Sequence, residues 1–267
     1  MIMRVVPVLF LILSITSCKT IKAQEQNTWN GKRSAVVLTY DDALNVHLDK
    51  VIPHLDKFNI KGTFYLIGEA QVTSNRLLDW RAAAKNGHEL GNHSLTHPCN
   101  GQGEGRSWVQ PEKDLTKYTL ERAVNEIRIT NTLLRAIDGK TERTFAYPCG
   151  DKKIDTVNYY NALKNDFVAA RGVNTGMQPL NGVDLDDVNC YYIDGNSGDY
   201  MIDLVKKAVE TKTLIVFLFH GVGGEHNINV SLEAHNELIK YLAEHKSDIW
   251  IAPMVDVAKY IEKKKTQ

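Results

Sequence analysis

The stretch "SAVVLTYDDALNVHLDKVIPHLDKFNIKGTFYLI", residues 34–67, decides the fold. It begins and ends with short apolar runs, "SAVVLTY" and "GTFYLI", whose branched and aromatic residues are typical of buried strands. Between them, "VHLDKVIPHLDKF" places apolar residues on one face of a helix, and Pro53 predicts a kink or a break. A strand, a helix and a second strand in this order favour a parallel sheet covered by helices.

The same alternation continues along the chain. Further strand-like runs are "HELG", "RTFAY", "DFVAAR", "LIVFLF" and "IWIA"; further helix-like patterns are "LERAVNEIRITNTLLRAI", "MIDLVKKAV", "SLEAHNELIKYLAEH" and "MVDVAKYIEK". No repeat of fixed length and no low-complexity linker interrupts them, so residues 31–267 are predicted to form a single α/β domain. Its sheet is either open or closed into a barrel, and in such folds the chemistry gathers at the C-terminal ends of the strands.

The charge balance argues against one broad class of partners. Lysine plus arginine equals aspartate plus glutamate, at 32 each among 267 residues. No global field therefore draws the protein to nucleic acid or to another acidic polymer. We expect any specificity to lie in a local site; the sequence does not indicate an oligomeric state.

The N-terminus has the features of an export signal. In "MIMRVVPVLFLILSITSC", one early arginine precedes an apolar run that is too short to span a bilayer. The end of this stretch resembles a bacterial lipobox, in which Cys18 is lipidated; cleavage by an ordinary signal peptidase is the alternative. We expect a lipoprotein-type signal peptide over residues 1–17 and a flexible tether over 18–30. The protein would then be an exported lipoprotein of the bacterial cell envelope, held to the membrane through Cys18.

Two clusters of polar residues follow strand-like runs. Asp41 and Asp42 come directly after "SAVVLTY", and the octet "GNHSLTHP" follows "HEL". Adjacent carboxylates in a strand point to opposite sides, so one could face a cation and the other a substrate, although an aspartate-rich turn looks the same. His93 and His97 are four residues apart, which places them on one face of a helical turn that Pro98 would end.

Together the two clusters predict a metal site. Two imidazoles and one carboxylate make a three-ligand set that leaves positions open for water, as hydrolytic sites do. These nitrogen and oxygen ligands favour one divalent ion, zinc first, and would also accept cobalt, nickel or iron. Non-haem iron oxygenases use the same ligand set, but the strand and helix alternation and the second aspartate argue against that alternative.

Four motifs give a specific resemblance. "TYDD", "HSLTHP", "FAYPCG" and "LIVFLFHG" occur in the order and roughly the spacing of the polysaccharide deacetylases, also called the NodB-homology group or carbohydrate esterase family four. The resemblance extends from about Lys32 to Ile261 and implies a distorted, incomplete (β/α) barrel. It also implies an enzyme that removes acetyl groups from chitin-like sugars, peptidoglycan or xylan.

The resemblance implies a role for each motif residue. Three residues would hold the metal: Asp42, His93 and His97. Asp41 would be the general base that takes a proton from water, and His220 would be the general acid that protonates the leaving group. A bound cation would activate the water and polarise the acetyl carbonyl. The developing negative charge would be shared by a backbone amide, which we assign to Cys149.

The third motif departs from the family's commonest pattern. Many members have an arginine and then a tyrosine where this chain has Ala146 and Cys149. That arginine normally steadies the catalytic aspartate. We predict that Arg171, at the end of the strand-like run "DFVAAR", replaces it; a surface ion pair is the alternative for this residue.

The cysteines leave a disulfide open. If Cys18 is lipidated, three cysteines remain and at least one thiol stays free. Cys99 and Cys149 lie within a few residues of site elements, and a bond between them would brace the pocket. We favour the interpretation that they are two buried, unpaired residues.

The remaining candidates border the site. The glycine-rich insertion "CNGQGEGRSWVQPEKDLTKY" contains Trp108, which could stack on a sugar face or anchor the loop to the core. Tyr147 of "FAYPCG" is a second candidate for substrate binding. The other histidines have no spaced partner and are expected to be solvated or structural: His47, His54, His88, His226, His235 and His245.

These observations predict a metal-dependent hydrolase that removes acetyl groups from a carbohydrate, with an N-acetylglucosamine-type oligo- or polysaccharide favoured. O-deacetylation of xylan uses the same residues and is an alternative. A catalytically weak, sugar-binding envelope lipoprotein is a second alternative. Ala146 favours that second alternative, whereas Asp41 and His220 argue against it.

Overall fold

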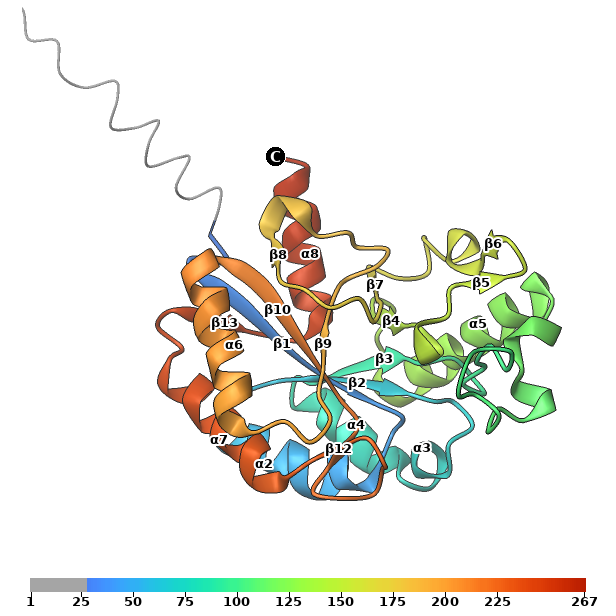
Figure 1. Cartoon of the computed structure of the whole chain (residues 1–267), viewed down its shortest axis with the longest axis horizontal. Coiled ribbons are helices and arrows are strands. Elements are labelled where there is room, and N and C mark those ends of the chain that lie inside the picture. Colours follow the sequence, from blue (N-terminus) through green and yellow to red (C-terminus); the bar gives the residue numbers. More distant parts are fainter. Residues whose placement is uncertain (1–27) are drawn as a thin grey trace, which may run out of the picture.

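The computed structural model describes residues 28–267 (Figure 1). The predicted signal peptide, Cys18 and the tether up to residue 27 lie outside the described residues. Trp29, which we placed in the tether, is fully buried, and its indole Nε1 donates a hydrogen bond to Lys212 O at 2.9 Å. The folded domain therefore begins earlier than predicted. In the part of the chain that the structure describes, no helix is long and apolar enough to cross a membrane.

Nine strands form the main sheet, in the order β7-β4-β3-β2-β1-β10-β8, with β13 beside β1 and β9 beside β10. Their bounds are β1 Ser34–Asp41, β2 Thr63–Leu66, β3 Glu89–Asn92, β4 Thr144–Ala146, β7 Ala169–Arg171, β8 Gln178–Pro179, β9 Tyr191–Tyr192, β10 Thr213–Phe219 and β13 Ile249–Ile251. All pairs are parallel except β8 with β10. Each of the seven predicted strand-like runs contributes a strand to this sheet.

The pairing of β1 explains why the sheet curls without closing. β10 pairs with one edge of β1 along most of its length. The other edge is shared, because β13 pairs with Ser34–Val36 and β2 pairs with Thr39–Asp41. The sheet ends at β7 on one side and at β8 on the other. The fold is therefore the curled, incomplete barrel that the resemblance implied.

Helices surround this sheet (Figure 1). Their bounds are α2 Ile52–Lys57, α3 Gln71–Asn75, α4 Leu77–Lys85, α5 Leu120–Asp138, α6 Gly198–Thr211, α7 Leu232–Glu244 and α8 Met254–Lys265. Short helical turns are η1 His47–Val51, η2 Pro111–Lys113, η3 Leu115–Lys117, η4 Pro148–Gly150, η5 Tyr159–Ala162 and η6 Leu180–Gly182. Pro53 lies in the first turn of α2, directly after the π-helical turn η1; the backbone stays helical at Val51 and Ile52, so the helix changes type here and the predicted break is not found. Two small two-stranded ladders complete the elements: β5 Lys153–Ile154 with β6 Val157–Asn158, and β11 Gly221–Val222 with β12 Asn229–Val230.

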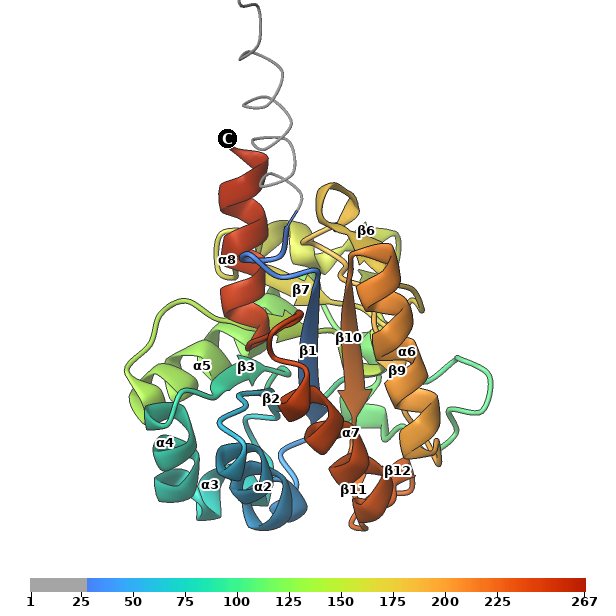
Figure 2. The same ribbon diagram turned by 90° about the vertical axis from the view of Figure 1, so that its left-hand side faces the viewer.

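Strand β1 is buried on both faces, which fixes the position of the residues that follow it. Val36 and Leu38 belong to the core cluster that includes side chains of α6 and α7. Ala35 and Val37 belong to the cluster that includes side chains of α8. Figure 2 shows α6 and α8 on opposite sides of β1 and β10. A strand covered on both faces is continuously apolar, as "SAVVLTY" is.

Candidate active site

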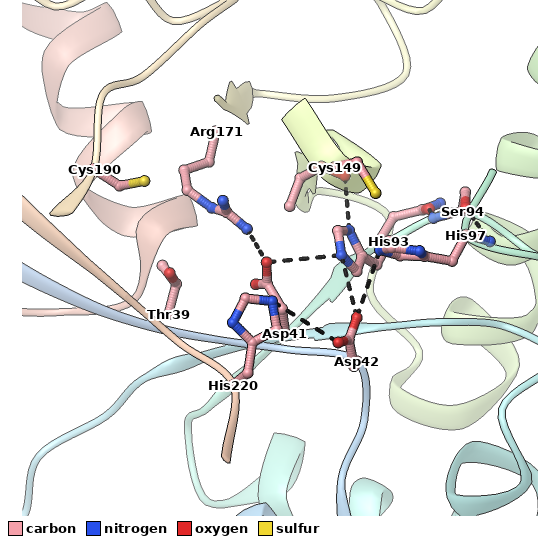
Figure 3. Close-up of polar contacts among 12 residues, drawn as sticks. Thr39, Asp41, Asp42, His93, Ser94, His97, Cys149, Arg171, Cys190 and His220 are labelled. Carbon is pink, nitrogen blue, oxygen red and sulfur yellow. Dashed lines mark hydrogen bonds and ion pairs between the residues drawn. The ribbon is translucent and has the colours of Figure 1, made fainter. Parts of the chain in front are cut away.

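The chain bends sharply after β1, at the two adjacent aspartates. Asp41 is the last residue of β1, and Asp42 and Ala43 both have left-handed backbone conformations, with φ of 80° and 57°. The Asp42 amide donates to Tyr65 O at 3.1 Å, which holds the bend against β2. Adjacent side chains of a straight strand point to opposite sides, but this bend brings both carboxylates to one cavity of about 790 Å³ (Figure 3).

Asp42, His93 and His97 form a compact group of candidate metal ligands. One ligand atom of each lies within 4.8 Å of the others. Asp42 Oδ1 is 3.5 Å from His93 Nε2 and 3.6 Å from His97 Nε2 (Figure 3). His93 Nδ1 donates to Ala146 O at 2.9 Å, so Nε2 carries the lone pair that a metal needs. Asp42 Oδ1 is buried and has no hydrogen-bond partner among residues 28–267.

The electrostatics of this group suit a bound cation. Burial lowers the pKa of His93 to about 3 and that of His97 to about 4, so both rings are neutral at neutral pH. Burial raises the pKa of Asp42, whose close partners are imidazoles. A divalent cation would supply the positive charge that this carboxylate lacks, so the residues fit the predicted metal.

His93 and His97 do not lie on a helical turn, and that prediction was wrong. The Asn92 side chain at the end of β3 accepts a hydrogen bond from the Ser94 amide at 2.7 Å, and Ser94 Oγ accepts one from the His97 amide at 3.0 Å. Ser94 and His97 have left-handed φ values of 65° and 55°. These local bonds replace helical ones and still bring the two imidazole centroids within 4.7 Å of each other.

Asp41 is paired with Arg171, as we predicted. Arg171 ends β7, in register with Ala146 of β4, and its guanidinium donates to Asp41 Oδ2 (Figure 3). Burial alone would raise the pKa of Asp41, but attraction to Arg171, with additional attraction to His93 and His220, holds the pKa below its usual value. Asp41 is therefore ionised at neutral pH. Its Oδ1 is buried without a partner in the described chain, so this oxygen is available to accept a proton.

His220 lies beside the two aspartates. It follows β10, which pairs in parallel with β1, so His220 and Asp41 leave neighbouring strands at the same edge of the sheet. Its Nε2 is 3.9 Å from Asp42 Oδ2. His47 Nε2 donates to the backbone carbonyl of His220 at 2.8 Å, which helps to hold this strand end. Burial lowers the pKa of His220, although attraction to both aspartates opposes the shift.

Cys99 and Cys149 form a disulfide, and our preference for two unpaired cysteines was wrong. The bond joins the segment after His97 to the turn after β4, across 50 residues of sequence. Cys190 is the free and buried thiol of the described chain. Such a pairing depends on which loops meet in space, and cysteine spacing alone does not reveal that.

His226 is a site residue that the sequence analysis missed. We grouped it with the solvated or structural histidines, but its Nε2 lies 3.6 Å from Asp42 Oδ2. Its ring stacks on that of His220, with centroids 4.9 Å apart. The signal that could have identified it is "GVGGEHN", a glycine-rich turn directly after His220. The prediction of a structural role is confirmed for His47 and His235, which are fully buried and hydrogen-bonded.

The two predicted substrate-binding residues differ in exposure. Trp108 lies on the cavity rim with 57% of its surface exposed, so its ring is available to a ligand. Tyr147 is 1% exposed, and its hydroxyl donates to Asp186 O at 2.7 Å. Its ring packs against Phe145 and other aromatic residues. Tyr147 therefore forms part of the inner wall of the cavity and also packs in the core, and its contact with substrate stays a prediction.

Comparisons with known proteins identify relatives over about half of the chain. A family model described as Polysaccharide deacetylase matches residues 29–168, just over half of the chain. The bifunctional xylanase/deacetylase of Pseudobutyrivibrio xylanivorans is 30% identical over 141 residues, which are 53% of this chain and 20% of that protein. The chitooligosaccharide deacetylase of Rhizobium leguminosarum bv. trifolii is 27% identical over 146 residues, which are 54% of each protein. The chain thus spans a fifth of one relative and about half of the other.

A solved structure shares the fold over most of the chain. The Xyl-CE4 domain of a multidomain xylanase, from the hindgut metagenome of Trinervitermes trinervoides, superposes with a TM-score of 0.56 at 19% identity. The superposition covers 87% of this chain and 91% of that domain, and so includes the part after residue 168 that the family model does not match. Family model, motifs and fold agree, and this chain belongs to the polysaccharide deacetylase family.

Proposed function

We propose that this protein is a metal-dependent hydrolase that removes acetyl groups from a carbohydrate, with an N-acetylglucosamine-type oligo- or polysaccharide as the favoured substrate. One observation carries the proposal. In a single cavity, the ionised and arginine-paired carboxylate of Asp41 lies beside the three-ligand group of Asp42, His93 and His97. A carboxylate kept ionised next to a metal site is suited to remove a proton from water.

Each side of the cavity would have its own task. Asp42, His93 and His97 would hold the ion, zinc first, and when bound it would act as a Lewis acid on the acetyl carbonyl. Asp41 would take the proton of the attacking water on Oδ1, because Oδ2 is occupied by Arg171. His220 would deliver a proton from Nε2 to the leaving nitrogen or oxygen.

Cys149 supports the proposed stabilisation of negative charge. It lines the cavity, and its backbone is left-handed with φ of 54°. In the same turn, the Gly150 amide donates to Tyr147 O and the Asp151 amide to Pro148 O, both at 3.0 Å, whereas no such bond engages the Cys149 amide in the described chain. That amide is therefore available to donate to an oxygen that gains charge during the reaction.

The cavity rim supports a carbohydrate substrate. Trp108 and Tyr192 line it with 57% and 45% of their surfaces exposed, and Val173 lines it with 41% exposed. Exposed rings beside a polar centre can stack on the apolar face of a sugar while the reacting group points inward. The resemblance to a chitooligosaccharide deacetylase favours an N-acetylated sugar. The resemblance to a xylanase/deacetylase keeps O-deacetylation of xylan as the second candidate.

Acetate release tests this proposal and separates the candidates. The protein is incubated with acetylated chitooligosaccharides, acetylxylan and peptidoglycan, with zinc, cobalt, nickel or iron supplied in turn. We expect metal-dependent acetate release, strongest from the chitooligosaccharides, and about 10³-fold slower from the Asp41→Asn control. Release from acetylxylan alone would select the second candidate. Sugar binding without acetate release under any of the four metals would overturn the hydrolase.

We further propose that the protein is an exported lipoprotein of the bacterial cell envelope, attached to the membrane through Cys18. The support is the apolar run that ends in "ITSC". Expression of the chain in a bacterium with a clickable fatty acid tests this. We expect labelled protein in the membrane fraction and loss of the label in Cys18→Ser. Unlabelled, water-soluble wild-type protein would contradict the anchor.

A further inference from the structure

We propose that His226 is a positioning residue that holds the metal-binding carboxylate of Asp42, by presenting the N–H of Nε2 to Oδ2 across 3.6 Å, and that it is not itself a metal ligand. The inference rests on the proposed metal centre and extends it with a residue that none of the four motifs contains. It depends on how the loop after β10 is held and on which ring nitrogen of His226 carries the proton.

The loop that carries His226 is closed by two short strands and anchored beside Asp42. The ladder of β11 and β12 pairs Gly221 with Asn229 and clasps both ends of the loop. Glu225, directly before His226, accepts hydrogen bonds from the Val46 amide at 2.6 Å and from Asn45 Nδ2 at 2.7 Å. Asn45 and Val46 belong to the segment that follows Asp42. The imidazole is therefore held against the bend that carries the carboxylate.

A backbone amide fixes the tautomer of the His226 ring. The Ile228 amide donates to His226 Nδ1 at 3.0 Å, and an amide hydrogen can only be donated. Ile228 O lies 3.3 Å from the same nitrogen, but it already accepts from the Gly221 amide at 3.0 Å, and an N–H at Nδ1 would meet the Ile228 hydrogen. Nδ1 is thus the acceptor. In the neutral ring the proton then sits on Nε2, the atom 3.6 Å from Asp42 Oδ2.

His93 shows the opposite arrangement, and the contrast separates a ligand from a positioning residue. In His93 a carbonyl accepts from Nδ1, so Nε2 offers a lone pair to a metal. In His226 an amide donates to Nδ1, so Nε2 offers a hydrogen instead. The two carboxylate oxygens of Asp42 face different imidazoles: Oδ1 faces His93, and Oδ2 faces His226. Partners that orient a ligating carboxylate in this way strengthen metal binding.

Two variants and one spectrum test the proposal on the whole chain. His226→Leu removes the donor at similar size, and His226→Gln keeps an N–H near the position of Nε2. Zinc affinity is measured by competition with a chromophoric chelator, after circular dichroism has confirmed that both variants are folded. We expect the leucine variant to bind zinc about 10- to 100-fold more weakly and the glutamine variant to recover to within about threefold of wild type.

Wild-type zinc affinity in His226→Leu would overturn the role of His226 while leaving the deacetylase proposal intact. A loss in both variants as large as that of His93→Gln would make His226 a ligand and also overturn it. Wild-type protein that binds no cation would overturn this inference together with the metal centre. In the cation-free protein, nitrogen-15 spectra are expected to show His226 protonated on Nε2; protonation on Nδ1 would contradict the tautomer assignment.

Discussion

Asp41 and Asp42 are neighbours in sequence, but they face opposite electrostatic surroundings. Asp41 ends a buried strand, and the guanidinium of Arg171 on a sheet strand holds its pKa low. Asp42 lies one residue further, on a left-handed bend, where imidazoles are its close partners and burial raises its pKa. The fold thus gives Asp41 a fixed positive charge, that of Arg171. Asp42 instead depends on a cation that can dissociate. The first is suited to a base and the second to a metal ligand.

Exchanging each carboxylate for an amide is the strongest way to break this comparison. We expect Asp41→Asn to lower kcat by about 10³-fold, because the base is lost, while zinc affinity stays within about threefold of wild type. Asp42→Asn should lose both activity and zinc binding. Activity assays and chelator competition measure the two properties separately. Equal loss of zinc binding in both variants would show that the two aspartates do not have separate tasks.

Removing the fixed cation should have the next largest effect. We expect Arg171→Met to lower kcat by about 10²-fold with zinc binding unchanged. Arg171 holds the pKa of Asp41 down, so without it that pKa rises and the base is protonated at higher pH. The acid limb of the kcat/KM profile should therefore move to higher pH. Near-normal turnover of the Arg171→Met variant would contradict the proposed role of Arg171.

The matched control is a second buried arginine. Arg143 is 1% exposed and paired with Asp138, and it donates to Leu90 O at 2.8 Å. Neither Arg143 nor its partners line the cavity. Arg143→Met should lower the melting temperature and leave the acid limb where it is. If the acid limb of the kcat/KM profile moved in both variants, the shift would result from a general loosening of the sheet and not from the loss of the Arg171 charge.

The disulfide braces the Asp42 side, and opening it should have an intermediate effect. Cys99 Sγ lies 3.6 Å from His97 Nδ1, whereas Arg171 is held by its own strand. We expect the Cys99→Ser/Cys149→Ser variant to bind zinc about tenfold more weakly, because the ligand loop is less constrained. The acid limb set by Asp41 should stay unchanged. Wild-type zinc affinity in this variant would mean that the bond does not support the metal side.

Much of the fold was predictable, because strands buried on both faces have a strong sequence signal. "SAVVLTY" and "LIVFLF" became β1 and β10, the central pair of the sheet. Helices α3 and α4 were not predicted. Leu78 of α4 is 73% exposed, so its apolar residues do not trace one face, although Trp80 is fully buried. A periodicity argument fails where a helix places an apolar side chain in solvent.

The site was predictable where residues follow strands and was missed where loops meet. Asp41, Asp42 and Arg171 end strands or follow them directly, so the convergence of strand ends predicted their proximity. The position of His226 depends instead on the pairing of β11 with β12, and the disulfide depends on two loops that meet beside the cavity. Both arrangements are tertiary: the glycine-rich turn "GVGGEHN" indicates a loop after His220, but it does not show that His226 reaches Asp42.

The smallest expected effect concerns the exposed rim, which neither aspartate controls. Trp108 is exposed and belongs to a loop that Arg106 ties to Cys149 O at 3.0 Å. We expect Trp108→Ala to raise KM for chitooligosaccharides about threefold, through loss of stacking, with kcat unchanged. Steady-state kinetics on oligomers of increasing length measure this. A fall in kcat with unchanged KM would place Trp108 in the chemical step.

The most direct test of the account is where a cation binds. Crystals of the protein soaked in zinc, with diffraction recorded on both sides of the zinc absorption edge, locate the ion from its anomalous signal. We predict one peak bonded to Asp42, His93 and His97 at about 2.0–2.2 Å, with Asp41 still paired to Arg171 and His226 outside the bonding distance. A peak on Asp41, or no peak among the three ligands at saturating zinc, would contradict the division of work between the two aspartates.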